Sequence, residues 1–531
     1  MPVRLSSAMT ADVFHHPADA LEAQAKARPG DKALIFPQEP AALTFERWHA
    51  EARALARSLV ALGIGPGDPV ALIAENRACW AVVQMAAAAC SALFVPLNTH
   101  YRRDDLIQAL QLSRAKVLFA VPEFRGNPYL AHVEAARDIL PDLEQVIAIG
   151  GDTARYADLI AAGETSDAAL PASDPDTPAA LLYTSGTTGA PKGAVLTHRA
   201  MMMNARETAA RLGLTAGDRW TSIIPLFHCA GSIMNMLGCL QTGAAYVGVP
   251  AFDPVLMFEV IEGECCTALS GVPTSYLAML DHPSRTEFDL SSLRTGTCGG
   301  ADCNAEILER CAREFPIPQV CQVYGQTESA TLVSAPSAND PERFATAGRP
   351  LPGYEVRITD PQTGAEQPRG EIGEIQARGP MVMLGYHDQP EATAETITED
   401  GWLKTGDLGS LTESGHLLIG GGRLRDMIIR GGENIYPAEI ENLLQSHTAI
   451  DKVAVFGLPD DYYGERVVAA VVLAAPASAA DLQAFCRDRI ARFKIPVEFF
   501  KMEAFPLTPS GKIRKAAIRE RASDGALSSL I

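Results

Sequence analysis

The chain has 531 residues, a mass of 56.6 kDa and a formal net charge of −19. Apolar residues make up 47% and charged residues 21% of it, which is typical of a folded globular protein and excludes a disordered chain. At about 100–200 residues per domain, this length predicts several domains. The acidic balance argues against a nucleic-acid-binding protein, which needs a basic surface, but allows a small anionic ligand, which needs only a local site.

The cysteines and the apolar segments suggest where the protein works. Eleven cysteines occur without a C-x-x-C pair, and Cys298 and Cys303 are too irregularly spaced for a zinc knuckle, so we expect buried thiols. The first 21 residues lack the apolar stretch of a signal peptide. The most apolar run, 81–97, is shorter than the roughly 20 residues of a membrane span. We therefore expect no membrane span and a cytoplasmic location.

Helical and strand patterns alternate through most of the chain. Thr44 is a candidate N-cap, and leucines follow it at helical spacing. Such alternation is typical of parallel sheets covered by helices. The elements predicted in chain order are a helix after Thr44, a strand at 70–74, a helix leading into a strand at 81–97, a helix at 104–114 and a strand at 116–121.

The pattern changes at about residue 353, where short strands between glycines, such as 373–379 and 416–419, replace the alternation. The three glycines at 420–422 and the charged stretch that follows are the best candidate for a domain boundary.

The last 105 residues then have the pattern of a separate unit, with strands at 453–456 and 467–473 and a helix at 481–492. The tail from residue 505 contains two prolines and Gly511, so we expect an ordered loop there.

Residues 183–193, with the sequence YTSGTTGAPKG, form the most informative segment. Backbone N–H groups and hydroxyls of such a loop can surround a polyphosphate, and Lys192 adds a positive charge. It is not a Walker A loop, whose lysine precedes Ser or Thr, because Lys192 precedes Gly193. Composition alone also fits a surface turn rich in Ser, Thr and Gly.

The order of these residues resembles the phosphate-binding signature of the AMP-forming adenylating enzymes, which include acyl-CoA synthetases, peptide-synthetase adenylation domains and firefly-type luciferases. The resemblance extends from about residue 31 to 515. It implies an α/β fold: a large N-terminal domain (1–422) of parallel-type sheets covered by helices, plus a small β-barrel-like part. A hinge at 423–426, which includes Arg425, and a small mobile α+β C-terminal domain (427–531) would follow.

Further motifs occur in the order that this family requires. Taken singly, they also fit a core histidine, a glycine turn, a solvated glutamate or surface cations, but their common order favours a nucleotide site. The glycine run before Arg423 is one residue longer than is usual in the family, which leaves the pose of that side chain open. The residues that the resemblance assigns to ATP and CoA are Thr184, Ser185, Gly186, Thr187, Thr188 and Lys192 for phosphates, Gly300, Ala301, Tyr324 and Gly325 for adenine, Thr327 for phosphate, Asp407 and Arg423 for ribose, and Gly431 and Gly432 for the pantetheine of CoA.

The resemblance also implies the catalytic, metal and acyl-binding residues. Glu328 and Thr184 would hold Mg²⁺, because this ion prefers a carboxylate plus substrate phosphates. Lys512, in the sequence PSGKIR, would join the substrate carboxylate to the α-phosphate, and His228 would lie beside the acyl group. The predicted acyl pocket consists of His228, Cys229, Gly231, Ser232, Val272 and Cys298.

The implied reaction has two steps. A carboxylate attacks ATP to give an acyl-adenylate and pyrophosphate, and the thiol of CoA then displaces AMP. The pocket segments contain no Arg or Lys and several small residues, which favours a medium-chain, branched or aromatic acid without a second charge.

Several alternatives stay open. The acceptor could be the pantetheine arm of a carrier protein, and a luciferase-like oxygenase would differ only in the second step. A non-catalytic nucleotide-binding protein would be expected to lack Lys512, Glu328 or Asp407, all of which are present. A homo-oligomer is compatible with the sequence. Residues 487–521 contain ten Lys or Arg and four Asp or Glu, so a basic segment lies where the C-terminal domain would approach ATP and CoA.

Overall fold

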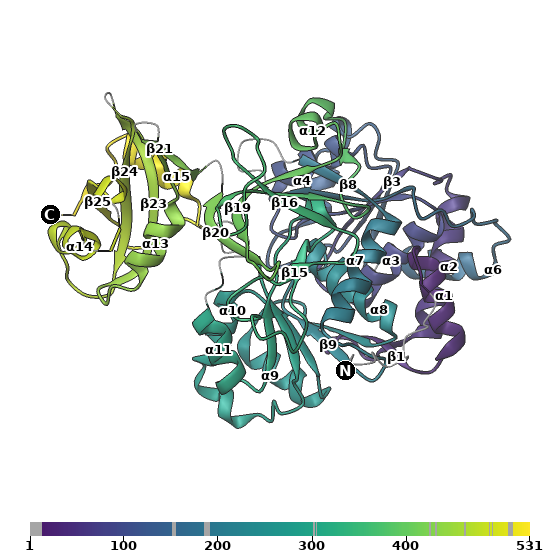
Figure 1. Ribbon diagram of the computed structural model, residues 1–531. Helices are drawn as coiled ribbons and strands as arrows, with labels where there is room; N and C mark the ends of the chain where they lie inside the picture. The colour runs from purple at the N-terminus through teal and green to yellow at the C-terminus, as the bar shows by residue number, and fades with distance from the viewer. Residues whose placement is uncertain are drawn as a thin grey trace.

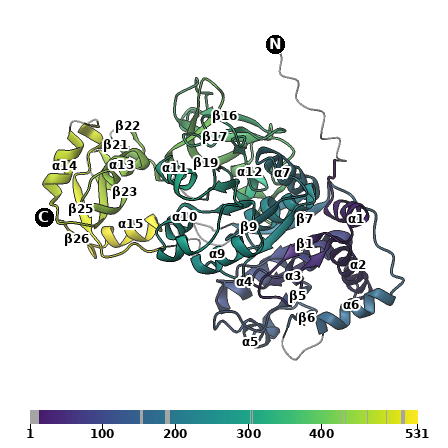
Figure 2. The ribbon, with the colours of Figure 1, turned by 90° about the horizontal axis from the view of Figure 1, so that it is seen from below.

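The computed structural model describes residues 13–150, 155–184, 192–300, 303, 305–423, 426–430, 433–460, 463–487, 489–490, 492–507 and 513–530. Most of them form a large body that contains two seven-stranded sheets, and the C-terminal residues form a smaller domain beside β20 (Figures 1 and 2).

The first sheet of the body carries the segments that matter most for function. Its strands are parallel from β13 to β1, and only β2 is antiparallel. In spatial order they are β13 (Gln319–Gln322), β12 (Thr295–Cys298), β11 (Ala268–Gly271), β9 (Arg219–Ser222), β10 (Ala245–Gly248), β1 (Lys32–Ile35) and β2 (Leu43–Thr44).

The second sheet is parallel over five strands and ends in an antiparallel edge formed by β8 and β18. Its order is β18 (Gly385–Tyr386), β8 (Lys192–Thr197), β7 (Pro178–Thr184), β4 (Leu93–Pro96), β3 (Pro69–Ile73), β5 (Val117–Ala120) and β6 (Gln145–Ala148).

Helices pack around both sheets (Figure 1). One cluster of buried side chains includes residues from both sheets. The helices of the body are α1 (Pro17–Ala27), α2 (Phe45–Ala61), α3 (Ala78–Ala89), α4 (Arg103–Ser113), α5 (Tyr129–Glu134), α6 (Arg155–Thr165), α7 (His198–Arg211), α8 (Gly238–Thr242), α9 (Pro254–Gly263), α10 (Pro273–Leu280), α11 (Ala305–Glu314) and α12 (Pro390–Thr396). The body also contains a π-helix, η2 (Ala230–Leu237), and the 3₁₀ turns η1 (Arg137–Ile139), η3 (Pro283–Glu287) and η4 (Thr327–Ser329).

Two antiparallel sheets follow the parallel ones. The four-stranded sheet contains β16 (Glu355–Thr359), β17 (Gly373–Arg378), β19 (Leu403–Leu411) and β20 (Leu417–Arg423), and a short pair contains β14 (Ser334–Ala335) and β15 (Arg349–Pro350). The C-terminal domain contains β21 (Ile428–Arg430), β22 (Glu433–Ile435), β23 (Ile450–Asp460), β24 (Gly464–Leu473), β25 (Glu498–Lys501), β26 (Ser528–Ser529), α13 (Pro437–Gln445), α14 (Ala479–Arg487), η6 (Arg492–Lys494) and α15 (Lys515–Ser523).

Most of the predicted elements are confirmed. The side chain of Thr44 accepts a hydrogen bond from the backbone N–H of Arg47 and so caps α2 as expected. The run 81–97 is indeed a buried helix followed by a strand, α3 and β4. The α/β fold with a small C-terminal domain is also confirmed.

One local prediction is wrong. The tail was expected to be a loop, but its residues 515–523 form α15, because neither proline nor glycine occurs between Gly511 and Gly525 and good helix formers follow Gly511. The glycines at 420–422, which were expected at the domain boundary, belong to β20, which continues through them to Arg423. The change from one sheet to the next takes place between Arg423 and Ile428.

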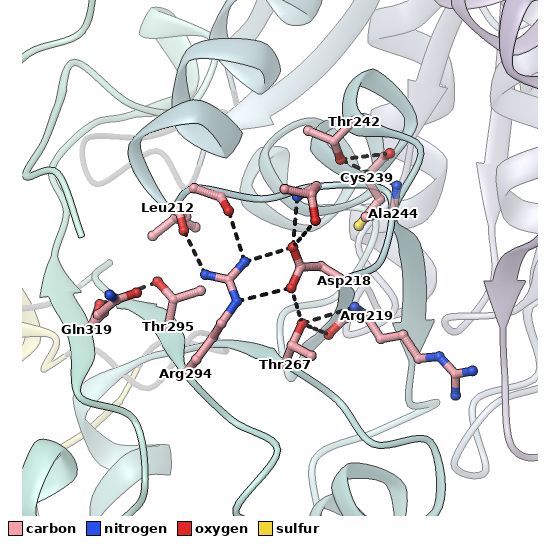
Figure 3. Close-up of polar contacts among 12 residues, drawn as sticks. Leu212, Asp218, Arg219, Cys239, Thr242, Ala244, Thr267, Arg294, Thr295 and Gln319 are labelled. Carbon is pink, nitrogen blue, oxygen red and sulfur yellow. Dashed lines mark hydrogen bonds and ion pairs between the residues drawn. The ribbon is translucent and has the colours of Figure 1, made fainter. Parts of the chain in front are cut away.

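A buried ion pair ties together the amino ends of three neighbouring strands (Figure 3). Arg294 donates from Nη2 to Asp218 Oδ2 at 2.7 Å and from Nε to Oδ1 at 3.1 Å, just before β12 and β9 begin. Thr267, next to β11, donates to Asp218 Oδ1 at 2.7 Å. Because this network holds one edge of the sheet, the loops at the opposite edge are free to carry function.

Candidate functional site

The predicted adenine and acyl segments meet at one edge of the first sheet. They directly follow β9, β11, β12 and β13, which are parallel neighbours in register, with Gly271 opposite Cys298 and Cys298 opposite Gln322. Carboxyl ends of parallel strands lie at the same edge, and this edge is where α/β sheets bind ligands. The topology therefore gathers segments that are about 100 residues apart in the sequence.

The predicted adenine-stacking and ribose-binding residues are in direct contact. The hydroxyl of Tyr324 donates to Asp407 Oδ2 at 2.9 Å, and both residues are only 8% exposed. Asp407 lies in β19 directly opposite Arg423 in β20, although only the backbone of Arg423 is described. This strand pairing brings the two predicted ribose contacts together.

The predicted phosphate lysine and the predicted Mg²⁺ ligand are joined through a third residue. Lys192 Nζ lies 4.9 Å from the centre of the Tyr386 ring, and the hydroxyl of Tyr386 donates to Glu328 Oε1 at 2.7 Å. Tyr386 is placed there by β18, which pairs with β8 immediately after Lys192. The backbone of Met383, just before β18, also donates to the carbonyl of Glu328.

The loop that carries Glu328 is fixed by close packing at Gly325 and by hydrogen bonds from α7. A Cβ atom on Gly325 would lie 2.0 Å from the carbonyl oxygen of Thr331, so this position requires glycine. Thr331 itself has a φ of +121°, which is unusual for a β-branched residue. The buried Asn204 of α7 bonds to the backbone of Ser329 and Leu332 and fixes the loop.

The turn predicted to contact adenine also needs its glycines. Gly300 has a φ of +78°, which favours glycine, and it is exposed at the end of β12. A Cβ atom on Gly299 would lie 2.8 Å from the side chain of Val323, so the turn packs directly against the segment that precedes Tyr324.

The predicted acyl segment forms the start of the π-helix η2, a type of helix that is frequent at functional sites. His228 is exposed, and its Nδ1 accepts a hydrogen bond from the backbone N–H of Ala230 at 3.1 Å. Cys229 Sγ lies 3.8 Å from Thr327 Oγ1, so the acyl segment touches the phosphate segment. Burial alone would raise the pKa of Cys229, but the charge of His228 and hydrogen bonds with His228 and two threonines hold that pKa below its usual value.

The small residues after His228 allow close packing of the backbone, in addition to leaving room in the predicted acyl pocket. A Cβ atom on Gly231 would lie 2.2 Å from the carbonyl oxygen of Pro225. The buried Ser232 donates to the carbonyl of His228 at 3.3 Å. Val272 and Cys298 close the same region at the ends of β11 and β12.

Part of the predicted site lies outside the described residues. Thr184 is described, and its Oγ1 donates to the carbonyl of Lys192 at 3.4 Å. The predicted residues outside the description are Ser185, Gly186, Thr187, Thr188, Ala301, Arg425, Gly431, Gly432 and Lys512.

The donor set at Glu328 fits Mg²⁺. Among the described residues, no group of three or more His, Cys, Asp or Glu is arranged to hold a metal ion. Mg²⁺ takes one or two carboxylates and otherwise binds substrate phosphates and water, so the single carboxylate of Glu328 suits this ion. One oxygen of Glu328 accepts from the hydroxyl of Tyr386, whose ring lies against Lys192.

Two residues of this site were missed by the sequence analysis. Tyr386 follows a glycine in a segment without any catalytic pattern, and Asn204 directly follows three methionines within α7. A polar residue next to an apolar run in a helix was the available signal for Asn204. Nothing in the sequence alone indicates the position of Tyr386, because strand pairing brings it to Lys192.

Comparisons with known proteins show which families and structures the chain is similar to. Residues 21–387 match the AMP-binding enzyme family, and residues 439–512 match the AMP-binding enzyme C-terminal domain. The chain is 38% identical to the putative acyl-CoA synthetase YngI of Bacillus subtilis over 528 residues, covering 94% of this chain and 96% of the relative.

Two further proteins widen the comparison. A CoA ligase of Rhodococcus jostii, named for a propanoyl substrate on a methyl-dioxo-octahydroindene ring, is 36% identical over 90% of this chain and 93% of its own. The crystal structure of the anthranilate CoA ligase AuaEII in complex with anthranoyl-AMP superposes with a TM-score of 0.86 at 27% identity, covering 97% of this chain and 99% of that one. No helix among the described residues has both the length and the apolar character for crossing a bilayer.

Proposed function

We propose that the carboxyl edge of the first sheet is the nucleotide and acyl site of this chain, which belongs to the AMP-binding enzyme family. The chain is an acyl-CoA synthetase, which activates a carboxylic acid with ATP and transfers the acyl group to CoA. The observation that carries this proposal is the hydrogen bond between Tyr324 and Asp407. It places a flat ring for adenine beside a carboxylate that can accept from both ribose hydroxyls.

The phosphates of ATP would lie between the two sheets. Lys192 from β8 supplies positive charge there, and Thr327 offers a hydroxyl next to Cys229. Mg²⁺ would be held by Glu328, with Thr184 as the second candidate, and it supplies charge neutralisation for the phosphates. Most of the rate enhancement then comes from positioning and charge stabilisation, because the protein forms no covalent bond in this reaction.

Lys512 is proposed to join the two anionic reactants. In the first step the carboxylate oxygen attacks the α-phosphorus of ATP, the bond to the bridging oxygen breaks, and pyrophosphate leaves. A lysine between carboxylate and α-phosphate lowers the repulsion between them. In the second step the sulfur of CoA attacks the acyl carbon, AMP leaves, and the thiol proton is lost.

The second step requires a different arrangement of the C-terminal domain. The thiol of CoA must enter the space that Lys512 occupies in the first step. A rotation about residues 423–426, including Arg425, would remove Lys512 and bring Gly431 and Gly432 to the entry for pantetheine. The change of sheet between Arg423 and Ile428 supports this position of the hinge.

The acid is proposed to be uncharged beyond its carboxylate, and medium-chain, branched or aromatic. Apart from His228, the residues proposed for the acyl side, such as Cys229, Ser232 and Val272, carry no positive charge, and no Arg or Lys is among them. The ring-bearing substrates in the names of the Rhodococcus and anthranilate ligases support this range.

A pyrophosphate-release assay tests the proposal. Acids of graded length and ring content are supplied with ATP, Mg²⁺ and either CoA or a pantetheine-bearing carrier protein. Acids with one carboxylate are expected to release pyrophosphate, and CoA is expected to be the acceptor. Release with dicarboxylic acids alone would contradict the acid class, and transfer to the carrier protein alone would contradict the acceptor.

The Lys512→Ala variant tests the role of that lysine. We expect adenylate formation to fall by about a thousandfold, as for loss of one group that stabilises the transition state. Thioester formation from supplied acyl-adenylate and CoA should stay near the wild-type rate. The matched control is Lys501→Ala, which removes an exposed lysine from β25 of the same domain. Equal loss of both half-reactions would show that Lys512 does not act as proposed.

A further inference from the structure

Two thiols lie in contact at the turn that is proposed to bind adenine. Cys303 Sγ is 3.2 Å from Cys298 Sγ, and Cys298 is the last residue of β12. Cys298 is buried, whereas Cys303 is partly exposed. A disulfide bond has a length of about 2.05 Å, so the two sulfur atoms need to move by only about 1 Å to form one.

The two thiols differ in ways that assign them different roles. The hydrogen-bonded partner Cys303 and burial raise the pKa of Cys298 well above its usual value. Cys303 is the thiol that a reagent from solution reaches first. In thiol–disulfide exchange, an accessible thiol usually attacks the reagent first and forms a mixed disulfide. A second thiol of the protein then attacks this mixed disulfide and forms the intramolecular disulfide.

The position of the pair connects it to the nucleotide site. The carbonyl of Cys298 accepts a hydrogen bond from the backbone N–H of Val323 at 3.0 Å, and Gly299 packs against the same valine. Val323 directly precedes Tyr324, the proposed stacking partner of adenine. A movement of Cys298 would therefore act on Gly299 and Val323, the chain neighbours of the proposed adenine contacts Gly300 and Tyr324.

We propose that Cys298 and Cys303 are a redox modification site, in which a small-molecule disulfide converts the two thiols into an intramolecular disulfide that weakens ATP binding. The second part of this inference rests on the proposed nucleotide site. The two thiols are expected to react with disulfides of small thiols, such as glutathione disulfide or the disulfide of CoA itself.

The chemistry balances with the disulfide as the oxidant. The thiolate of Cys303 attacks one sulfur of the reagent, a mixed disulfide forms, and one small thiolate leaves and takes up a proton. Cys298 then attacks the sulfur of Cys303, and its proton passes to the second small thiolate, which leaves as a thiol. Two protein thiols are oxidised by two electrons, and one disulfide is reduced to two thiols.

Peptide mapping after treatment of the full-length protein with glutathione disulfide tests the first part. Both cysteines lie on one tryptic peptide, residues 295–310. We expect this peptide to become lighter by two hydrogen atoms and to resist alkylation, and dithiothreitol should reverse both changes. The idea is overturned if both cysteines stay open to alkylation, or carry glutathione without a crosslink, while the exposed Cys265 becomes modified.

Calorimetric titration with ATP and Mg²⁺ tests the second part. The oxidised protein should bind ATP about tenfold more weakly than the reduced protein. Cys303→Ser should bind normally and lose the response to oxidant, whereas Cys265→Ser should keep the response. Crosslinking without any change in ATP affinity would overturn the coupling.

The two readouts also separate this inference from the proposed function. If the nucleotide site is misassigned, Asp407→Ala leaves the ATP affinity of the reduced protein unchanged, whereas the crosslink is still seen in the peptide map. Since the map uses the unmodified sequence, poor folding of Cys303→Ser would not hide the result.

Discussion

Tyr386 shows how one side chain can organise a charged site. Its hydroxyl bonds to Glu328, and its ring faces Lys192. A carboxylate and an ammonium group placed side by side without ATP would attract each other and close the site. A tyrosine between them contacts both charges and keeps them apart for the phosphates and the metal ion. The proposed roles of Glu328 and Lys192 therefore depend on a residue that has no charge.

We predict that Tyr386→Phe weakens the use of ATP without unfolding the protein. The change removes one hydrogen bond to a charged group, which contributes about 1.5–3 kcal/mol, and keeps the ring beside Lys192. The kcat/KM for ATP in pyrophosphate release should fall about tenfold or more, and the Mg²⁺ concentration for half-maximal activity should rise.

Tyr129→Phe is the control for this prediction. It removes the hydroxyl of a buried tyrosine in α5, which donates to the carbonyl of Thr99 and not to Glu328. It should lower the thermal stability slightly and leave the Mg²⁺ dependence unchanged. An unchanged Mg²⁺ dependence in Tyr386→Phe would mean that the hydrogen bond to Glu328 has no role in metal binding.

At the scale of elements, one edge of the first sheet contributes to stability and the opposite edge carries the proposed site. Its amino edge is fixed by Arg294, Asp218 and Thr267, and its carboxyl edge carries the proposed site (Figure 3). Burial would raise the pKa of Asp218, but hydrogen bonds from Arg294 and Thr267 outweigh it and hold that pKa below its usual value. The loops at the carboxyl edge are thus mounted on strands whose relative positions are set elsewhere.

We predict that Arg294→Met destabilises the protein strongly at neutral pH, because it leaves the carboxylate of Asp218 buried without its partner. Breaking a buried ion pair costs about 3–5 kcal/mol, and the partial exposure of Arg294 favours the lower end of this range. Urea unfolding followed by tryptophan fluorescence reports the change, since Trp220 lies next to this network in β9.

The pH dependence of this effect has a defined sign. The folded pKa of Asp218 is lowered, so the ion pair stabilises the protein above the unfolded pKa of about 3.9 and loses its contribution as the pH falls through the folded value. The difference between Arg294→Met and wild type should therefore shrink below about pH 4. In the double variant with Asp218→Asn, the loss at pH 7 should be smaller than in Arg294→Met alone. A difference that stays constant from pH 7 to the acid limit would rule out the ion pair as its source.

At the scale of the whole molecule, acidic residues of the C-terminal domain neutralise the positive charge of the basic segment, residues 487–521. Residues 487–521 carry an excess of six positive charges, but residues 427–531 as a whole contain thirteen Lys or Arg and thirteen Asp or Glu. Lys494, Lys515 and Arg519 pair with Glu439, Glu441 and Glu465 of the same domain. The C-terminal domain is therefore neutral, and the net charge of −19 belongs to the rest of the chain. Attraction to ATP must come from individual side chains and cannot come from the net charge of the domain.

We predict that Arg425→Pro separates the two half-reactions. Proline fixes φ near about −65°, which restricts rotation at the proposed hinge. Formation of the acyl-adenylate should change little, whereas thioester formation should slow by about tenfold or more, because it follows the rotation.

Arg425→Ala removes the same charge and keeps the rotational freedom, so both of its half-reactions should resemble wild type. Single-turnover assays that measure pyrophosphate and acyl-CoA separately check the prediction. If the proline and alanine variants behave alike, the charge of Arg425 matters and the hinge does not lie there.

The sequence by itself determined the alternation of helices and strands, the cap at Thr44 and the ordered series of motifs from Thr184 to Lys512. These features depend on neighbouring residues, on hydrophobic periodicity and on local turn chemistry, all of which can be read along the chain. The sequence was misleading at α15, because the prolines of the tail precede a helix that begins only at Lys515.

Only the tertiary structure decided which side chains meet. Parallel pairing of β9, β11, β12 and β13 brings the adenine and acyl segments to one edge, and antiparallel pairing of β18 with β8 brings Tyr386 to Lys192. The contact between Tyr324 and Asp407 spans 83 positions, and that between Asp218 and Arg294 spans 76. Such contacts arise from long-range strand register and burial, which no local pattern encodes. For this reason the sequence could name the separate parts of the site, while their arrangement required the fold.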